Sequence, residues 1–242
     1  MKDADEFLRI CAEVGTQSGN FLLPRVRSAV FGIPEASMRF ASWIGGKPSP
    51  SPFAWPELHG ELAVFIGQLD CAEIHAAAQL DPIPRTGILQ FFVTGTGAIW
   101  DEPSWENGRV RWVPNAPPDS ASAGESLALI EKPTLHPCQP PTEEIPQEIL
   151  DGSTYFQLRQ QLDGDRRGWV VQIAGFADPV QEVMDAELEQ FGGLEANRWM
   201  LLSCFNASAK DFAPYYGRYY FWIPMGDLME RQFSRVLMLF QS

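Results

Sequence analysis

Polar and glycine residues gather around one turn in the first half of the chain, and their types suit a small-ligand site. Gly45 and Gly46 are consecutive, and a turn of this kind can direct backbone N–H groups at an anion. Gln68 and Asp70 end an apolar run, where their side chains could project into a cleft. Trp55 lies between Gly46 and Gln68 and completes the candidate ligand-binding set.

The same residues also have structural interpretations. Gly45 and Gly46 suit a tight turn before Pro48. Asp70 directly precedes a segment with helical spacing, so its carboxylate can accept one of the unpaired N–H groups of the first helical turn. The sequence favours the turn and the helix cap over the ligand site.

Two cysteine–histidine pairs could supply four zinc ligands. Cys71 and His75 are four residues apart, which places them on one face of a helix, and His136 and Cys138 are two apart. Neither pair has the spacing of a zinc knuckle, and 61 residues separate the two histidines (136 − 75). The sequence therefore favours no metal site.

No cofactor motif or catalytic motif is present. The chain lacks a phosphate-binding Walker loop, a dinucleotide fingerprint and a Gly-x-Ser-x-Gly nucleophile turn. Its three histidines lie in no recognisable nucleophile context. We therefore expect no cofactor, assign no catalytic residue and favour a non-enzymatic role.

A second candidate surface is acidic and lies late in the chain. Carboxylates crowd one stretch, and they are Glu182, Asp185, Glu187, Glu189 and Glu195. Such a cluster can speed association with a basic protein. The alternative is an ordinary solvated helix face.

Composition narrows the class of protein. The 242 residues carry 18 Lys and Arg against 31 Asp and Glu, a net charge of −13. This excess of acid excludes a general nucleic-acid binder and argues against docking on anionic membranes. No apolar run is long enough to cross a bilayer, and the acidic first residues do not resemble a signal peptide. We therefore expect a cytoplasmic protein whose four scattered cysteines are free thiols, and its oligomeric state is not indicated.

The elements that would position these residues are mostly strands. Helical spacing predicts short helices over residues 4–14, 71–80, 153–162 and 180–190. Alternating or apolar runs predict strands over residues 22–31, 37–44, 62–69, 88–93, 109–113, 198–205, 218–223 and 233–240. Pro, Ser and Asp predict loops over residues 114–124 and 133–148. Because helices and strands do not alternate regularly, the fold class is α+β with mixed, largely antiparallel sheets.

Two parts of the chain share a similar order of glycines and predicted strands. Gly45 and Gly87 are 42 residues apart, and so are Gly175 and Gly217, with a buried strand between the glycines of each pair and an aromatic strand after it. This pattern suggests related halves over about 40–125 and 165–242 that share one core within a single domain, 1–242. Chance similarity of short apolar patterns is the alternative.

An ordered set of motifs resembles the bacterial YwqG-like family. The matching residues are Ser42-Trp43-Ile44-Gly45-Gly46-Lys47-Pro48, Trp55-Pro56, Gly60, Phe65-Ile66-Gly67-Gln68-Leu69-Asp70 and Gly87-Ile88-Leu89-Gln90-Phe91-Phe92. The likeness extends over about residues 40–242 and implies a mixed α/β fold with duplicated elements. The family has no known function, so it supplies no catalytic residues. The second half departs from the pattern with Cys204-Phe205-Asn206, where a Gln-Ile-Asp-like ending is expected.

Two functional hypotheses follow. The first is a non-enzymatic interaction module, in one form an inhibitor or immunity-type protein, that binds a basic partner through the acidic stretch. The second is a small-ligand-binding protein or enzyme with its site between the two halves, near the glycine turns and Gln68.

Overall fold

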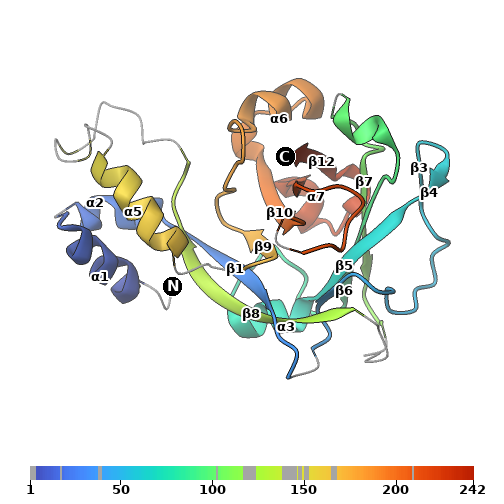
Figure 1. The fold of residues 1–242 in the computed structure, drawn as a ribbon, viewed down its shortest axis with the longest axis horizontal. Coiled ribbons are helices and arrows are strands. Elements are labelled where there is room, and N and C mark those ends of the chain that lie inside the picture. The colour runs from blue at the N-terminus through green and yellow to red at the C-terminus, as the bar shows by residue number, and fades with distance from the viewer. Residues whose placement is uncertain are drawn as a thin grey trace.

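Ten strands form one large sheet in which all neighbours run antiparallel, in a computed structural model (Figure 1). The structure describes residues 4–16, 18–37, 40–101, 103–116, 124–137, 146, 149, 153–164, 168–208 and 210–242. In spatial order the strands are β12 (Leu237–Gln241), β11 (Arg218–Pro224), β10 (Trp199–Asn206), β9 (Val171–Ala174), β1 (Arg27–Pro34), β8 (Glu125–Thr134), β2 (Trp43–Ile44), β5 (Val64–Asp70), β6 (Ile88–Val93) and β7 (Gly108–Val113). A separate hairpin contains β3 (Glu57–Leu58) and β4 (Glu61–Leu62).

Short helices accompany the sheet. They are α1 (Ala4–Val14), α2 (Gly19–Leu22), α3 (Cys71–Ala77), α5 (Ser153–Gly164), α6 (Asp185–Gly192) and α7 (Met225–Met229). Among the described residues, short turns of 3-10 helix lie at Leu23–Arg25, Gly97–Trp100, Ala196–Arg198 and Phe233–Arg235. The α+β class with largely antiparallel pairing is therefore confirmed.

The sheet curls until its two end strands almost meet. An isolated bridge joins Ser104, just before β7, to Met238 on β12. A Cβ atom added at Gly108 would lie only 2.5 Å from the Cβ of Met238, so glycine permits this close approach. The closure places β7 beside the C-terminal part of the chain.

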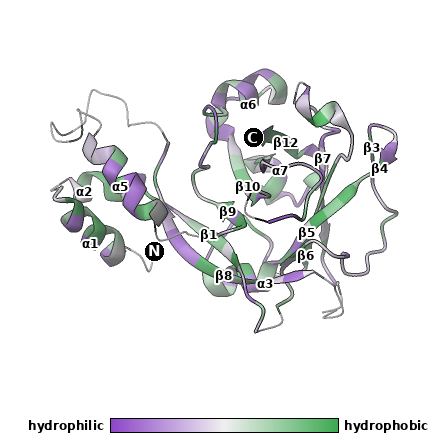
Figure 2. Cartoon of the chain, viewed as in Figure 1, coloured by the Kyte–Doolittle hydropathy of each residue, from purple (hydrophilic) through white to green (hydrophobic). Residues whose placement is uncertain are grey.

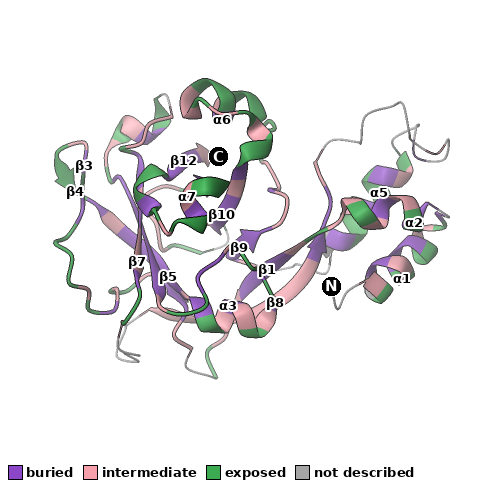
Figure 3. Cartoon of the chain, turned by 180° about the vertical axis from the view of Figure 1, so that it is seen from behind, coloured by how far each residue is buried: buried purple, intermediate pink, exposed green. Residues whose placement is uncertain are grey.

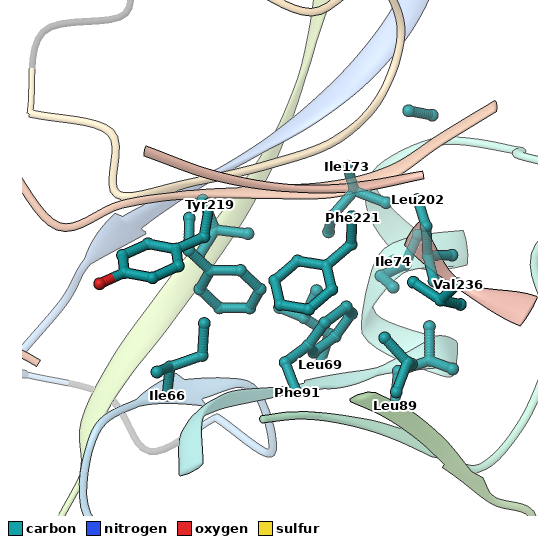
Figure 4. Packing of buried hydrophobic residues seen from close by; sticks show 14 of the residues in the cluster. Ile66, Leu69, Ile74, Leu89, Phe91, Ile173, Leu202, Tyr219, Phe221 and Val236 are labelled. Atoms are coloured by element: carbon teal, nitrogen blue, oxygen red, sulfur yellow. The ribbon is translucent and has the colours of Figure 1, made fainter. Parts of the chain in front are cut away.

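Apolar side chains fill the space that the curled sheet encloses (Figure 4). All six residues of β6 are buried, and Phe91 points inward to rings from strands on the far side. Its ring centre lies 4.9 Å from that of Phe205 and 5.1 Å from that of Phe221. Because side chains alternate across a strand, the neighbours of these inward-facing rings along each strand point to the outer face of the sheet, where other elements must cover them.

Three sets of elements cover or extend the outside of the sheet. Residues 45–63 cross the outer face of β5 and β6, where Trp43, Leu58 and Phe92 form a small apolar cluster. α6 covers another cluster around Trp199 and Tyr220. α1, α2 and α5 pack on one another at one side of the sheet (Figure 1). Figure 3 shows the strands largely buried, whereas α6 and α7 have exposed outer surfaces.

Several predicted boundaries are wrong for identifiable reasons. Residues 22–25 are helical, so the first strand begins at Arg27 instead of at Leu22. Only residues 43–44 of the predicted strand 37–44 pair as a strand, and residues 38–39 lie outside the described residues. α3 ends at Ala77, and α6 begins at Asp185, five residues later than predicted.

The sequence pattern does not predict the short β3 or two strands of the ten-stranded sheet, β8 and β9. The ten-residue β8 contains charged residues and only three buried positions, so it lacks a clear apolar pattern. β9 has four residues, too few to show a period. Together with β1 they form the middle of the sheet.

Candidate functional site

Gln68 and Asp70 hold the local backbone together. Gln68 is completely buried; its Oε1 accepts from the Ser49 backbone N–H at 2.8 Å, and its Nε2 donates to the Ala41 carbonyl at 2.9 Å. Asp70 caps α3, because its Oδ1 accepts from the Glu73 backbone N–H at 2.9 Å. The predicted cap is therefore confirmed, and Gln68 tethers the loop that follows β2.

Gly45 and Gly46 form a left-handed turn that is partly satisfied within the chain. Their φ angles are 64° and 67°, a region that glycine adopts without strain. The Gly45 N–H donates to the Ile66 carbonyl at 2.9 Å. That N–H is already bonded, so it is not free for an anion.

Trp55 is the member of the predicted ligand set that lies in an open cleft. The cleft has a volume of about 770 Å³ and lies between residues 52–57, β7 and the turn at 231–234. Trp55 is 45% exposed and Phe53 is 50% exposed, which is unusual for such large apolar side chains. Gln68, Asp70, Gly45 and Gly46 do not line this cleft.

Hydrogen bonds and ring contacts fix the orientation of the aromatic walls. The Trp55 Nε1–H donates to the Ala63 carbonyl at 2.7 Å, and the indole meets Phe92 edge-on with ring centres 5.3 Å apart. On the opposite wall, the Trp112 Nε1–H donates to the Thr86 carbonyl at 3.0 Å. Both indoles are thus held in place while part of each remains accessible.

Arginines supply the charge of the cleft. Arg109 and Arg111 alternate along β7 and lie on the same, outward face. Among the residues that the structure describes, neither has a carboxylate partner within 4 Å. Burial, and next the charge of Arg109, lower the pKa of Arg111 from its usual value. An anion placed between the two guanidinium groups would relieve that repulsion.

Two further contacts complete this cationic and aromatic wall. The Arg111 guanidinium carbon lies 5.7 Å from the ring centre of Phe53 and 5.5 Å from that of Phe92, so it is flanked by rings. Arg231 also lines the cleft, and its Nη1 donates to the Pro82 and Leu228 carbonyls. The cleft therefore combines positive charge and flat apolar surfaces in a chain whose net charge is −13.

A comparison with known protein families assigns the chain to one of them. The domain of unknown function DUF1963 matches residues 42–242. The chain belongs to the DUF1963 family. No curated protein matches it. Every residue that lines the cleft lies within the DUF1963 match, whereas β1, in the middle of the sheet, precedes it.

The structure describes three of the four residues considered as zinc ligands, and each has its own contacts. The Cys71 thiol is buried, and burial raises its pKa to about 12. The His75 Nε2 lies 3.1 Å from the Ile83 carbonyl, and His136 packs edge-on against Phe176. Cys138 lies outside the described residues. Within the described part of the chain, no three or more His, Cys, Asp or Glu side chains are grouped closely enough to hold a metal.

The acidic residues of the second candidate surface lie on α6 and its flanking loops, a largely hydrophilic region (Figure 2). Glu182, Asp185, Glu189 and Glu195 are exposed. Burial, and next the charge of Glu182, raise the pKa of Glu187. Considering only described residues, none of the five forms an ion pair.

Sequence reasoning missed the residues that define the cleft. The sequence pattern assigns Arg109 and Arg111 only to a predicted strand. The alternation of Arg109 and Arg111 was a usable signal, because two cations on one face of a strand repel each other.

The helices that the structure describes include none with the length and apolarity needed to span a bilayer.

Proposed function

We propose that this DUF1963 chain is a binding protein for a small anion that carries a flat apolar group. The cleft between residues 52–57, β7 and residues 231–234 is the proposed site. The observation that carries the proposal is the pair Arg109 and Arg111, on one strand face without carboxylate partners among the described residues.

The chemistry of the cleft suits both parts of such a ligand. Guanidinium groups bind carboxylates or phosphates through paired, charge-assisted hydrogen bonds. The exposed rings of Phe53 and Trp55 offer apolar surfaces for a flat group. Residues 52–57 and β7 of the cleft come from the first predicted half of the chain and residues 231–234 from the second. The small-ligand hypothesis also placed its site between the halves, but near Gln68 and the glycine turns, which do not line this cleft.

A matched pair of probes tests the proposal. 2-Naphthoate and 2-naphthol share a flat ring system, but only the first carries a carboxylate at neutral pH. We expect 2-naphthoate to raise the midpoint of thermal unfolding and 2-naphthol or inorganic phosphate alone to raise it less, because binding to the folded state stabilises it. Equal shifts with the two naphthalene probes, or no shift with 2-naphthoate, would contradict the proposal.

Variants assign the binding to the cleft. Arg111→Gln removes the charge but keeps a polar side chain, and we expect it to weaken 2-naphthoate binding by about tenfold or more, the effect of a lost charge-assisted hydrogen bond. Arg85→Gln is the matched control, since Arg85 is exposed and lies outside the cleft. A similar loss of affinity in both variants would point to general electrostatics instead of this site.

A second candidate function is docking of a basic protein on α6 and its flanking loops. It is supported by five neighbouring carboxylates without ion-pair partners among described residues and by the raised pKa of Glu187. An affinity-tagged chain should then retain a stoichiometric basic partner at low salt and release it at high salt. The double variant Glu182→Gln/Glu195→Gln should retain less, and equal retention would count against this docking surface.

We also propose that the chain contains two duplicated halves and that it is a YwqG-like member of DUF1963. The pairing of β5 with β6 shifts register between Phe65 and Gly67. The pairing of β10 with β11 shifts register between Leu201 and Ser203, which lie 136 residues after Phe65 and Gly67 (201 − 65 and 203 − 67). The glycines that follow β2 and β9 both adopt left-handed angles. These correspondences support two related halves in one domain, with β1 as an integral strand.

A further inference from the structure

The arginine cleft carries more positive charge than a ligand with one negative charge would neutralise. Among the described residues that line the cleft, the charged ones are Arg109, Arg111, Arg231 and Glu57. Three positive charges therefore stand against one negative charge, in a chain whose net charge is −13. A ligand with two negative charges would balance this local excess.

The protein itself leaves the excess charge in place. In the described part of the chain, no carboxylate lies within 4 Å of the Arg109, Arg111 or Arg231 guanidinium groups. Arg231 donates instead to the Pro82 and Leu228 carbonyls, which carry no net charge. Glu57 is exposed and forms no ion pair with a described residue. The charge of the arginines is thus available to a ligand.

The spacing of two of these arginines suits an anion with three oxygens. Arg109 and Arg111 are two residues apart on β7, so their side chains leave one strand face about 7 Å apart. Burial, and next the charge of Arg109, lower the pKa of Arg111, so the two guanidinium groups interact. A carboxylate has two oxygens and suits one guanidinium group, whereas the three terminal oxygens of a phosphate monoester can accept from both.

The exposed aromatic surface begins beside the guanidinium groups. The Arg111 guanidinium carbon lies 5.7 Å from the Phe53 ring centre, and the rings of Phe53 and Trp55 are about half exposed. A flat group seated against these rings therefore needs its phosphate attached directly or through a very short link to meet the arginines. This arrangement fits an aryl phosphate better than a nucleotide, in which a ribose separates the base from the phosphate.

We propose that the ligand of the arginine cleft is an aryl phosphate monoester, bound as a dianion between Arg109 and Arg111 with its ring against Phe53 and Trp55. This inference rests on the proposed anion-binding function and names the chemical class of its ligand. The cleft volume of about 770 Å³ lies within the range of small-molecule sites.

2-Naphthyl phosphate and 2-naphthoate test the proposal, since they share one ring system and differ in the anionic group. In isothermal titration at about pH 7.5 we expect the phosphate to bind about tenfold more tightly, the effect of one further charge-assisted contact. Adenosine 5′-monophosphate should bind less tightly than 2-naphthyl phosphate. Tighter binding of the nucleotide would overturn the assignment of an aryl phosphate.

The pH dependence of binding tests the charge of the bound phosphate. A phosphate monoester loses its second proton with a pKa of about 6, whereas a carboxylate is already ionised at about pH 5.5. Lowering the pH from about 7.5 to about 5.5 should therefore weaken the binding of 2-naphthyl phosphate by about threefold. The affinity for 2-naphthoate should stay constant, and it reports any change in the protein itself. Equal pH profiles for the two probes would overturn binding as a dianion.

A variant assigns the preference for phosphate to the arginine pair. Arg109→Gln leaves one guanidinium group on this strand face, so the preference for 2-naphthyl phosphate over 2-naphthoate should fall to about twofold or less while both still bind. Arg85→Gln, which lies outside the cleft, is the matched control and should keep the full preference. A preference that survives in Arg109→Gln would overturn binding between the two arginines.

The outcomes separate this inference from the proposed function. If 2-naphthoate binds and 2-naphthyl phosphate binds no more tightly, the aryl phosphate is overturned while the anion cleft stands. If neither probe binds, both are overturned. Free aryl phosphates and phosphotyrosine side chains share this chemistry, so a blocked phosphotyrosine tripeptide is compared with phenyl phosphate. Both orders of affinity support an aryl phosphate; tighter binding of the tripeptide assigns the site to phosphopeptides, and weaker binding assigns it to free aryl phosphates.

Discussion

Asp178 is the polar centre that joins α5, the segment after β9 and β11, and its removal should destabilise the fold strongly. Its carboxylate accepts from Arg159 Nη2 at 3.0 Å and from Arg218 Nη1 at 2.9 Å. The arginine side chains are each 19% exposed and that of Asp178 is 28% exposed, so all three are largely withdrawn from water. Asp178→Ala would remove the carboxylate from both guanidinium groups, leaving Arg159 with the Pro137 carbonyl and Arg218 with the backbone carbonyl of residue 178 as acceptors.

The size of the effect follows from these contacts. Each charge-assisted hydrogen bond contributes about 1.5–3 kcal/mol, and partial exposure lets water replace some of that. We expect Asp178→Ala to lower the free energy of unfolding by about 3 kcal/mol, which corresponds to a fall of about 6–12 °C in the midpoint for a chain of this length. The Asp178 carbonyl, which accepts from the Tyr220 hydroxyl at 2.8 Å, is unaffected by the substitution.

Urea unfolding, followed by circular dichroism, measures this difference directly. Asp81→Ala is the matched control, because Asp81 pairs with Arg85 while their side chains are 82% and 74% exposed. That control should change the free energy by less than about 0.5 kcal/mol. If Asp178→Ala were no more destabilising than Asp81→Ala, the assignment of Asp178 as a stabilising centre would be refuted.

Three other predictions concern the core and its thiols. Gln68→Leu removes hydrogen bonds that hold the loop after β2 and should cost about 2–4 kcal/mol in urea unfolding; a cost below 1 kcal/mol would show that the loop is held otherwise. Gly67→Ala would place its Cβ 2.8 Å from a Phe205 ring atom and should cost about 1–3 kcal/mol, whereas Gly97→Ala, with no atom within 4 Å, should be nearly neutral in the same assay. Cys71, whose burial raises its pKa to about 12, should react with a thiol reagent at pH 8 only after unfolding, and rapid modification of the native chain there, located by peptide mapping, would contradict its burial.

The sequence predicted the parts of the fold whose burial is one-sided or complete. β6 is buried along its whole length and apolar at every position except Gln90, because both of its faces are covered, and the start of α3 is indicated by the cap at Asp70. β8 could not be recognised, because its cover is uneven and its charged residues hide the alternation. Its place between β1 and β2 depends on pairings with distant segments that no local pattern records.

The candidate site shows the same limit. Trp55 was selected from a motif, and Arg109 and Arg111 were visible as alternating residues in a predicted strand. Nothing local brings residues 231–234 to them, because that contact arises from the closure of the sheet between β7 and β12. A cleft assembled by closure can be found only once the whole sheet is known.

The most direct test of the account is isothermal titration of 2-naphthoate into the wild type, Arg109→Gln/Arg111→Gln and Arg85→Gln. We predict that the double variant loses about a hundredfold in affinity or more, since two charge-assisted contacts are removed, while Arg85→Gln binds as the wild type does. Equal dissociation constants for the wild type and the double variant would contradict the claim that the arginine cleft is the binding site.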